Sequence, residues 1–257
     1  LMRLVAMGID PYVVATRVPV VIEFADGNVA VVPMVRHLGS EHRQSMAPYV
    51  YGGPVFLRPP EEAHMDEIGK IPRWYTDIVL YGNPFSPYAW EQEGLVRWRI
   101  HTHVLDLSSG FDEVYAGLRT MMRRHCRAAE KAGVSVGIAA DLREVDEYYE
   151  AYLDSLQRWG DGATSRYPRS LFHAFHERQE ADGGVRLWVG SIDAQVVSGV
   201  LVLYHGAHSV VWHAATHSEH LASNASALVY LTAIRDAGAR GLRWFDFNPS
   251  GSLRGVE

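Results

Sequence analysis

Two side chains in the last fifty residues have the chemistry to accept a proton. Asp246 alternates with Phe245 and Phe247 in the stretch WFDFNPSGS (244–252). A carboxylate between aromatic residues on a strand must find polar partners, because burying it without them is costly. His213, in HGAHSVVWHAATHSEH (205–220), carries an imidazole that exchanges its proton near neutral pH. Asp246 has a structural alternative, as a cap or a hydrogen-bonded turn residue, and His213 is one of 13 histidines.

The histidine-rich stretch also raises the question of a metal site. Five histidines fall within residues 205–220, but their spacing over a strand and a turn forms no standard ligand set. Cys126 is the single cysteine, which excludes an internal disulfide framework and a multi-cysteine zinc site. We therefore predict no metal, and the cysteine usage favours a cytoplasmic protein.

The elements that carry these residues are clearest in the second half of the chain. Hydrophobic spacing and end signals predict four helices, over residues 108–133, 142–160, 168–183 and 223–241. Five strands are predicted over 134–138, 185–190, 196–204, 209–215 and 242–247, with tight turns at SIDAQ and HGAH. This order favours a mixed sheet flanked by helices.

The first half shows a similar series of elements. Two strands, 18–24 and 29–35, are joined by the hairpin sequence ADGN, and a third covers 49–57. A helix over 61–75 and a strand over 77–83 follow, and this last strand ends in Asn83-Pro84, as the later one ends in Asn248-Pro249. The repeat predicts two copies of one unit, over residues 1–105 and 106–257.

Composition limits the class of partner. The net charge is −6, whereas proteins that coat nucleic acid are usually basic, so extended nucleic-acid binding is disfavoured. No apolar run reaches the ~18–20 residues of a membrane span. Because one chain holds both units, we expect a monomer or a weak dimer.

Three stretches together resemble one family. They are MRRHCRAAEKAGVSVGI, ASALVYLTAIRDAGARGLRWFDFNPSGSLRGVE and APYVYGGPVF. Their order, with the predicted elements, is similar to that of the FemAB-like family, whose tandem units have the fold of GNAT acyltransferases. The resemblance implies an α/β fold with two GNAT-like units around mixed sheets, each incomplete at a chain end. Family members continue into a Phe-Lys pair and closing strands, and this sequence stops at Glu257 before them.

The resemblance also implies where a site would lie. In such units one strand splays from its neighbour, here 209–215 from 242–247, and an acyl group sits in the gap. Asp246 and His213 then become candidate catalytic residues. Six further residues are candidates for substrate binding, at the gap, in the loop before residue 168, and between the units: Trp212, Asn248, Arg166, Arg169, Tyr49 and Tyr51. For the two arginines an ordinary charged surface loop is the alternative.

Two kinds of acyl donor remain possible, aminoacyl-tRNA and acyl-CoA. Ser223, Asn224 and Ser226 open the helix 223–241, and its N-terminal N–H groups suit a phosphate. N-capping is the alternative role for Ser223 or Asn224. The glycine-containing pyrophosphate loop of CoA-dependent GNAT enzymes is missing from HSEHLASNASALVY, which favours aminoacyl-tRNA over acyl-CoA as donor. No tightly bound cofactor is expected.

The sequence thus predicts a FemAB-like N-acyltransferase. It would pass an aminoacyl or acyl group to an amine on a peptidoglycan precursor, a peptide or a small metabolite, and the acceptor end of a charged tRNA is a candidate partner. A CoA-dependent GNAT acetyltransferase with a divergent phosphate loop is one alternative. A catalytically inactive binding module of the same fold is another.

Overall fold

The computed structural model of the chain describes residues 15–37, 40–45, 51–83, 85, 96, 101–160 and 166–249. The chain divides into two compact units, residues 1–100 and 101–257. The boundary predicted between residues 105 and 106 falls at the end of β8 (Thr102–Asp106). This strand was not predicted, and it pairs with β13 (Trp244–Pro249) of the second unit.

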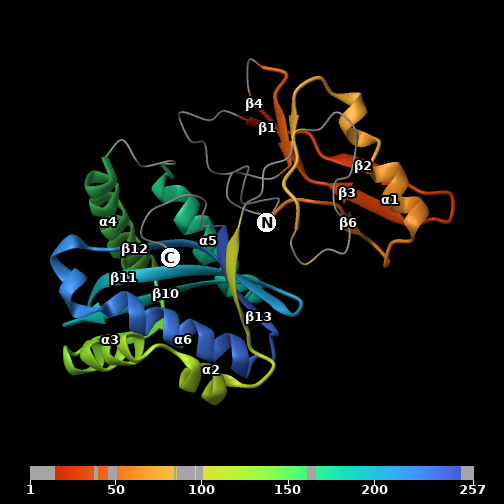
Figure 1. Cartoon of the computed structure of the whole chain (residues 1–257). Helices are drawn as coiled ribbons and strands as arrows, with labels where there is room; N and C mark the ends of the chain where they lie inside the picture. Colours follow the sequence, from red (N-terminus) through yellow and green to blue (C-terminus); the bar gives the residue numbers. More distant parts are fainter. Residues whose placement is uncertain are drawn as a thin grey trace. The chain divides into compact units, whose positions relative to one another are not determined.

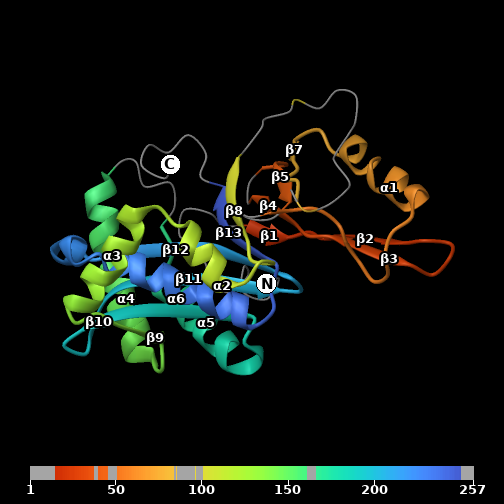
Figure 2. The ribbon, with the colours of Figure 1, turned by 60° about the horizontal axis from the view of Figure 1, so that its bottom comes forward.

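The second unit is built on a six-stranded mixed sheet in the order β8-β13-β12-β11-β10-β9. β9 (Ser135–Ile138), β10 (Val185–Ile192), β11 (Gln195–His205) and β12 (His208–Thr216) pair antiparallel, and β12 pairs parallel with β13. The two predicted tight turns are present, with positive φ at Asp193, Ala194 and Gly206, as short hairpin turns require. Figure 2 shows β8 and β13 side by side at one edge of the sheet.

Helices cover both faces of this sheet (Figure 1). α4 (Leu142–Trp159) and α5 (Arg169–Asp182) lie on one face, and α2 (Phe111–Gly117), α3 (Thr120–Lys131) and α6 (Ala225–Ala239) lie on the other. The core between α6 and the sheet is apolar and includes Val200, Val202, Val211, Val229, Ala233 and Phe245. The prediction of a mixed sheet between helical layers is confirmed.

The helix predicted over residues 108–133 is in fact two helices. Leu118 and Arg119 take extended ψ values of 142° and 141°, which ends α2 before α3 begins. The Arg123 guanidinium reaches back and donates to the carbonyls of Ala116 at 2.6 Å and Leu118 at 2.7 Å. These carbonyls lie at the end of α2 and lack helical partners, so Arg123 replaces the hydrogen bonds that a continuous helix would have made.

In the first unit the described strands form two small sheets. One has the order β1-β4-β5-β7 and the other β2-β3-β6. Their bounds are β1 Ala15–Arg17, β2 Val20–Glu23, β3 Val29–Val32, β4 Met34–His37, β5 Arg43–Ser45, β6 Val55–Phe56 and β7 Ile78–Val79. The predicted hairpin is confirmed as β2–β3. The predicted helix 61–75 is α1 (Glu62–Ile68) followed by a 3-10 turn (Ile71–Trp74).

Two strands predicted in the first unit are much shorter than expected. Residues 51–54 of the stretch 49–57 are not in a strand, and only Ile78 and Val79 of 77–83 are. Gly52 lies in close contact with its neighbours there: a Cβ on it would come 2.5 Å from Ser45 Oγ and 2.7 Å from the Tyr81 carbonyl oxygen. Close backbone approach, not strand pairing, explains this glycine. The described residues of the first unit therefore form two small sheets in place of the single sheet seen in the second.

Candidate functional site

The strands β12 and β13 separate in the middle of the sheet. They pair in parallel at only three positions, from His208↔Trp244 to Val210↔Asp246, although β12 continues to Thr216. On the other edge of β12, pairing with β11 runs on to Ser198↔Thr216. The interrupted pairing is the splay that was predicted between these two strands. It leaves β12 residues beyond Val210 without β13 as a neighbour.

Alternation along β12 identifies backbone groups that face this opening. The His217 N–H donates to the Val197 carbonyl at 2.9 Å, so odd-numbered residues here face β11. The peptide groups of Ala214 and Thr216 therefore face away from β11, toward the side where β13 has diverged. The Thr216 carbonyl agrees with this, since it accepts from Ser155 Oγ at 3.2 Å.

A β-bulge in β12 places two large side chains on the same face. Leu201 opposes His213 and Val202 opposes Val211, so Trp212 is the extra residue. A bulge interrupts the strict alternation of side chains across the sheet. Trp212 and His213 accordingly both contact α5, with Trp212 4.9 Å from the Phe175 ring centroid and His213 5.3 Å from that of Phe172.

His213 is enclosed by aromatic rings and bonded to a tyrosine. Ring centroids of Tyr148, Tyr152, Tyr167 and Phe172 lie between 4.6 and 5.9 Å from its own. Tyr148 Oη is 2.5 Å from His213 Nδ1. Burial raises the pKa of Tyr148 well above 10 and lowers the pKa of His213 from 6.5 to about 3. At neutral pH both groups are therefore neutral, and the direction of the hydrogen bond between them is set by the imidazole tautomer: the phenol donates when the ring proton is on Nε2.

Asp246 is fully buried and tied to three strands. Its Oδ1 accepts from Thr102 Oγ1 on β8 at 2.6 Å and from the Asn248 N–H at 2.8 Å, and its Oδ2 lies 3.3 Å from His208 Nε2 on β12. These contacts meet the requirement for polar partners by joining β8, β13 and β12. They support the structural alternative for Asp246 over the role of general base.

Asn248 follows two residues later, just past the end of the pairing between β12 and β13. Its φ is 71°, and the pairing of β13 with β8 shifts register between Asp246 and Pro249. Asn248 is 8% exposed, and within the described part of the chain no group donates a hydrogen bond to its buried Oδ1. A buried amide oxygen in this condition is uncommon in native proteins.

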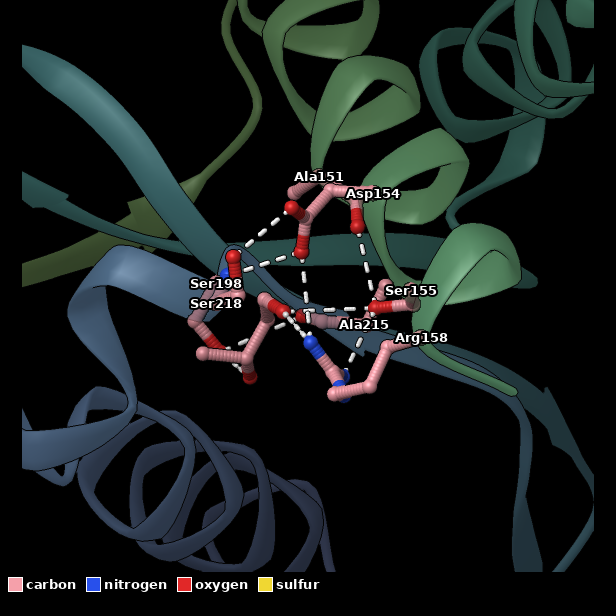
Figure 3. A network of polar contacts seen from close by, with 8 residues as sticks. Ala151, Asp154, Ser155, Arg158, Ser198, Ala215 and Ser218 are labelled. Atoms are coloured by element: carbon pink, nitrogen blue, oxygen red, sulfur yellow. Dashed lines mark hydrogen bonds and ion pairs between the residues drawn. The ribbon is translucent and has the colours of Figure 1, made fainter. Parts of the chain in front are cut away.

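The segment that links β12 to α6 is held by a carboxylate, as Figure 3 shows. Asp154 on α4 accepts from the Ser218 N–H and from Ser218 Oγ, both at 2.8 Å. Arg158 donates to Asp154 at 3.2 Å and to Ser155 Oγ at 3.1 Å. The hydrogen bond from the Ser218 side chain is the first cause that lowers the pKa of Asp154, so the carboxylate is ionised at neutral pH.

The three predicted phosphate ligands lie at the end of this segment. A 3-10 turn (Ser218–Ser223) leads to Asn224 at φ 58°, and α6 starts at Ala225. Ser223 Oγ donates to the His220 carbonyl at 2.6 Å and accepts from the Ala225 N–H at 3.2 Å. Asn224 Nδ2 donates to the Ala222 carbonyl, and Ser226 is partly buried in the first turn. Asn224 is the N-cap residue of α6 and makes no side-chain capping hydrogen bond, while the Ser223 hydroxyl is engaged in the turn before the helix.

The remaining candidates are dispersed. Arg169 lies 3.2 Å from Asp146, is bonded to Glu150 and stacks on Tyr149, so its charge is already matched. Arg166 is exposed. Tyr51 belongs to the first unit, where its ring is 6.3 Å from Phe85, and Tyr49 lies outside the described residues. Among the described residues, no group of three or more His, Cys, Asp or Glu side chains is arranged to hold a metal ion.

Sequence reasoning missed the partners that define these residues. Tyr148 bonds His213, Thr102 and His208 bond Asp246, and Asp154 holds the segment after β12. In α4, Val145, Tyr148 and Tyr152 are fully buried. Their spacings of three and four residues are those of one helix face, so the periodicity did contain a signal for Tyr148.

Comparison with solved structures defines the class of fold. The crystal structure of FemX matches with a TM-score of 0.61 at 14% identity, covering 100% of this chain and 83% of that one. The C-terminal domain of a putative lysylphosphatidylglycerol synthetase from Agrobacterium fabrum matches with a TM-score of 0.62 at 12% identity. This match covers 91% of this chain and 70% of that one. L-PGS from Bacillus licheniformis matches with a TM-score of 0.59 at 11% identity, covering 93% of this chain and 73% of that one. At these identities the likeness shows a shared fold.

Family membership follows from sequence. The family described as acetyltransferase (GNAT) domain matches residues 116–255, more than half of the chain. The chain therefore belongs to the GNAT acetyltransferase family, and the FemAB-like resemblance predicted from the sequence is confirmed at the level of fold. A search of curated proteins gives no match. Within the described residues no helix is long and apolar enough to cross a membrane.

Proposed function

We propose that this protein is an N-acyltransferase of the FemAB-like kind, which passes an aminoacyl or acyl group to an amine. The observation that carries the proposal is the end of β12–β13 pairing at Val210 and Asp246, in a chain of the GNAT family. A peptide-like acyl carrier can lie in such an opening as a substitute strand. The acceptor would be an amine on a peptidoglycan precursor, a peptide or a small metabolite.

Backbone and side-chain donors on β12 would stabilise the developing charge. The Ala214 N–H faces the opening, and preorganised N–H groups lower the barrier most when they point at the oxygen that becomes negative. His213 follows the bulge as a neutral imidazole, and we take the tautomer in which Nδ1 accepts from Tyr148 and Nε2 carries the proton. In this proposal His213 acts as a fixed hydrogen-bond donor, which replaces the sequence-based hypothesis that it takes a proton.

The amine would then react in its neutral form. With a pKa of about 3, His213 is a weak base that does not take up a second proton at pH 7, and Asp246 is committed to Thr102 and Asn248. The nitrogen attacks the acyl carbon, the C–N bond forms, and the bond from that carbon to the carrier's oxygen or sulfur breaks. The proton released by nitrogen leaves with the carrier or passes to water.

The contacts of Asp154 favour aminoacyl-tRNA as the donor over acyl-CoA. An ionised carboxylate takes the Ser218 N–H and hydroxyl at the start of the segment before α6, and Ser223 Oγ is engaged with the His220 carbonyl and the Ala225 N–H. A diphosphate would meet a negative charge there instead of open donors. Both donors are made inside the cell, so such a reaction would take place in the cytoplasm, without a tightly bound cofactor.

The decisive experiment compares both donors with a panel of amines. We expect transfer of radiolabelled amino acid from charged tRNA to an amine, and no binding of acetyl-CoA by calorimetry, with desulfo-CoA as control. The variant Asp154→Asn removes the charge and keeps the shape. If wild type binds acetyl-CoA with micromolar affinity, the CoA-dependent alternative holds; if neither donor is used, the chain is a binding module.

A further inference from the structure

A row of positive charge on α3 is the strongest feature of the second unit that the proposed reaction does not use. Arg124, Arg127 and Lys131 are exposed, and their spacing of three and four residues places them on one face of the helix. The opposite face carries Cys126 and Ala129, which are buried. These three cations, here called the α3 stripe, therefore point away from the core.

The charges of the α3 stripe are not matched within the described part of the protein. None of its three cations makes an ion pair there, not even with Glu130, the acidic residue of the same helix. Seven arginines elsewhere do pair with a carboxylate, namely Arg36, Arg43, Arg58, Arg143, Arg158, Arg169 and Arg186. Like charges three and four residues apart destabilise a helix, so an anionic partner would stabilise this face.

The length of the α3 stripe indicates the kind of anion. Arg124 and Lys131 are seven residues apart, which corresponds to about 10 Å along the helix axis. A nucleic-acid duplex carries a phosphate about every 3.4 Å along each strand, so a row of this length spans several phosphates. Two of the three cations are arginines, whose guanidinium groups match phosphate oxygens. The stripe therefore suits a phosphate backbone better than a single phosphate.

The position of α3 connects the stripe to the opening between β12 and β13. Cys126 and Ala129 pack in one cluster with Ala225, Ala227 and Leu228 of the first half of α6. Figure 1 shows α3 and α6 next to each other on the same face of the sheet. The N-terminus of α6 follows directly on the segment that leaves β12. A donor with its acyl end in the opening can therefore extend past the start of α6 to α3.

The apolar residues of α3 argue against a membrane as the anionic partner. A helix that lies in a membrane interface places a broad apolar face in the lipid and its cations beside that face. In α3 the residues Cys126 and Ala129 are covered by α6. Met121 and Met122 are exposed at the first turn, and the rest of the outer face is formed by the stripe.

We infer that the α3 stripe binds the phosphate backbone of the acceptor stem of the donor tRNA. The inference rests on the proposed function and adds a surface, outside the opening, that holds the body of the donor. Because the stripe does not touch the reacting groups, its loss should weaken binding of charged tRNA and leave the chemical step unchanged.

Fluorescence anisotropy of the full chain with a labelled hairpin RNA, which carries a tRNA acceptor stem and its single-stranded CCA end, tests the inference. We expect wild type to bind with an affinity that falls as salt rises. Arg124→Gln/Arg127→Gln should bind at least fivefold more weakly. The slope of log Kd against log salt should decrease by about 1.5, because each lost phosphate contact removes about 0.7–0.9. An unchanged Kd would overturn the inference.

Two further double variants control for net charge and for folding. Lys70→Gln/Arg143→Gln makes the same change in net charge at exposed cations that pair with glutamates, and it should bind the hairpin like wild type. Arg124→Lys/Arg127→Lys keeps the charge of the stripe and should retain most of the affinity. Equal losses in the two glutamine variants would show that only net charge matters, and would overturn the inference.

Two other anions are compared with the same variants. Vesicles that contain phosphatidylglycerol test a membrane, and adenosine 3′,5′-bisphosphate tests the phosphate-bearing end of coenzyme A. We expect neither to bind through the α3 stripe. Stripe-dependent binding of the vesicles without binding of the hairpin would assign α3 to a membrane surface. Stripe-dependent micromolar binding of the bisphosphate would assign it to acyl-CoA, and either result would overturn the inference.

The two proposals fail in different ways. If wild type transfers the amino acid from charged tRNA and Arg124→Gln/Arg127→Gln does so with unchanged KM, the stripe has no part in binding and the proposed function stands. If the hairpin binds through the stripe while charged tRNA is not consumed, the RNA surface stands and the transferase proposal is wrong. We expect a raised KM for charged tRNA, an unchanged kcat, and unchanged turnover of a charged CCA trinucleotide, which lacks the stem.

Discussion

Single residues in this unit take their chemistry from their surroundings. His213 and Asp246 are the obvious proton acceptors by residue type, yet each is committed to neighbours: His213 to Tyr148, and Asp246 to Thr102, Asn248 and His208. Asn248, a neutral residue, has a buried Oδ1 to which no group of the described residues donates. Protein environments shift reactivity by burial and hydrogen bonding, so residue type alone ranks candidates poorly.

The first prediction concerns the pH dependence of stability through His213. Burial lowers its pKa to about 3 from 6.5, so between these values the unfolded chain binds one more proton than the folded chain. The contribution of neutral His213 to the free energy of unfolding is complete above pH 6.5. It is lost as the pH falls below that value, with a slope of up to about 1.4 kcal/mol per pH unit. Urea unfolding of wild type and His213→Gln from pH 7.5 to 4.5 should show a shallower decline in the variant. Parallel curves would contradict it.

The second prediction concerns Asp246 as a structural residue. Asp246→Ala leaves the Thr102 hydroxyl and the Asn248 N–H without their acceptor, and should lower the free energy of unfolding by about 3 kcal/mol. Thr102→Val removes one donor only and should lower it by about 1 kcal/mol. Denaturant titration measures both. An Asp246→Asn variant of native stability but without turnover would instead support a catalytic role.

At the scale of elements, α4 is what fixes the geometry around β12. Its side chains reach the bulge through Tyr148, and the segment before α6 through Asp154, Ser155 and Arg158. Gly199 on β11 makes the close approach of Tyr148 possible. A Cβ there would be 2.6 Å from Tyr148 Cδ2, well inside contact distance. The helix and the bulge are thus positioned together.

The third prediction tests this coupling with two glycines. Gly199→Ala should force Tyr148 away from His213 and lower the free energy of unfolding by about 1–3 kcal/mol. Gly137→Ala on β9 is the matched control, because a Cβ there has no neighbour within 4 Å, and its effect should stay within about 0.5 kcal/mol. Thermal and urea unfolding report both values. Equal effects of the two substitutions would refute the coupling.

At the scale of the whole molecule, the second unit is self-contained in its strand pairing. All six strands of its sheet, β8 included, come from residues 101–257, and helices of the same unit cover both faces. Among the described residues, the strands of the first unit pair with one another. The tandem arrangement of two GNAT-like units remains our proposal for the full chain, since the FemX likeness spans the whole of it.

The fourth prediction is that residues 101–257 fold without the first unit. Because the six strands of its sheet and the core beneath α6 all come from residues 101–257, the fragment should keep both. Circular dichroism should show mixed α/β content, and urea should unfold the fragment in one cooperative transition. A fragment starting at residue 107, which lacks β8 and the Thr102 bond to Asp246, is the control and should be clearly less stable. Non-cooperative unfolding of the longer fragment would refute the prediction.

The sequence by itself determined the elements of the second unit and their order. Periodicity, caps and turn residues depend on neighbours within a few positions, so strands β9 to β13 and helices α4 to α6 were predicted close to their observed bounds. The same local signals could not show that α2 ends at Leu118, because Arg123 supplies the terminal hydrogen bonds from the next helix. They also gave no indication of β8, which is defined by its pairing with β13.

Only the tertiary structure decided which candidate residues are engaged. The bonds of Asp246 to Thr102 and of His213 to Tyr148 span 144 and 65 residues, and the Asp154 contact with Ser218 spans 64. Hydrogen bonding and burial over such separations depend on how strands and helices pack. Local sequence does not encode that packing in any readable form. The physical reason is that a side chain's chemistry is set by its solvent exposure and partners, and both are fixed only when the sheet and its helices assemble.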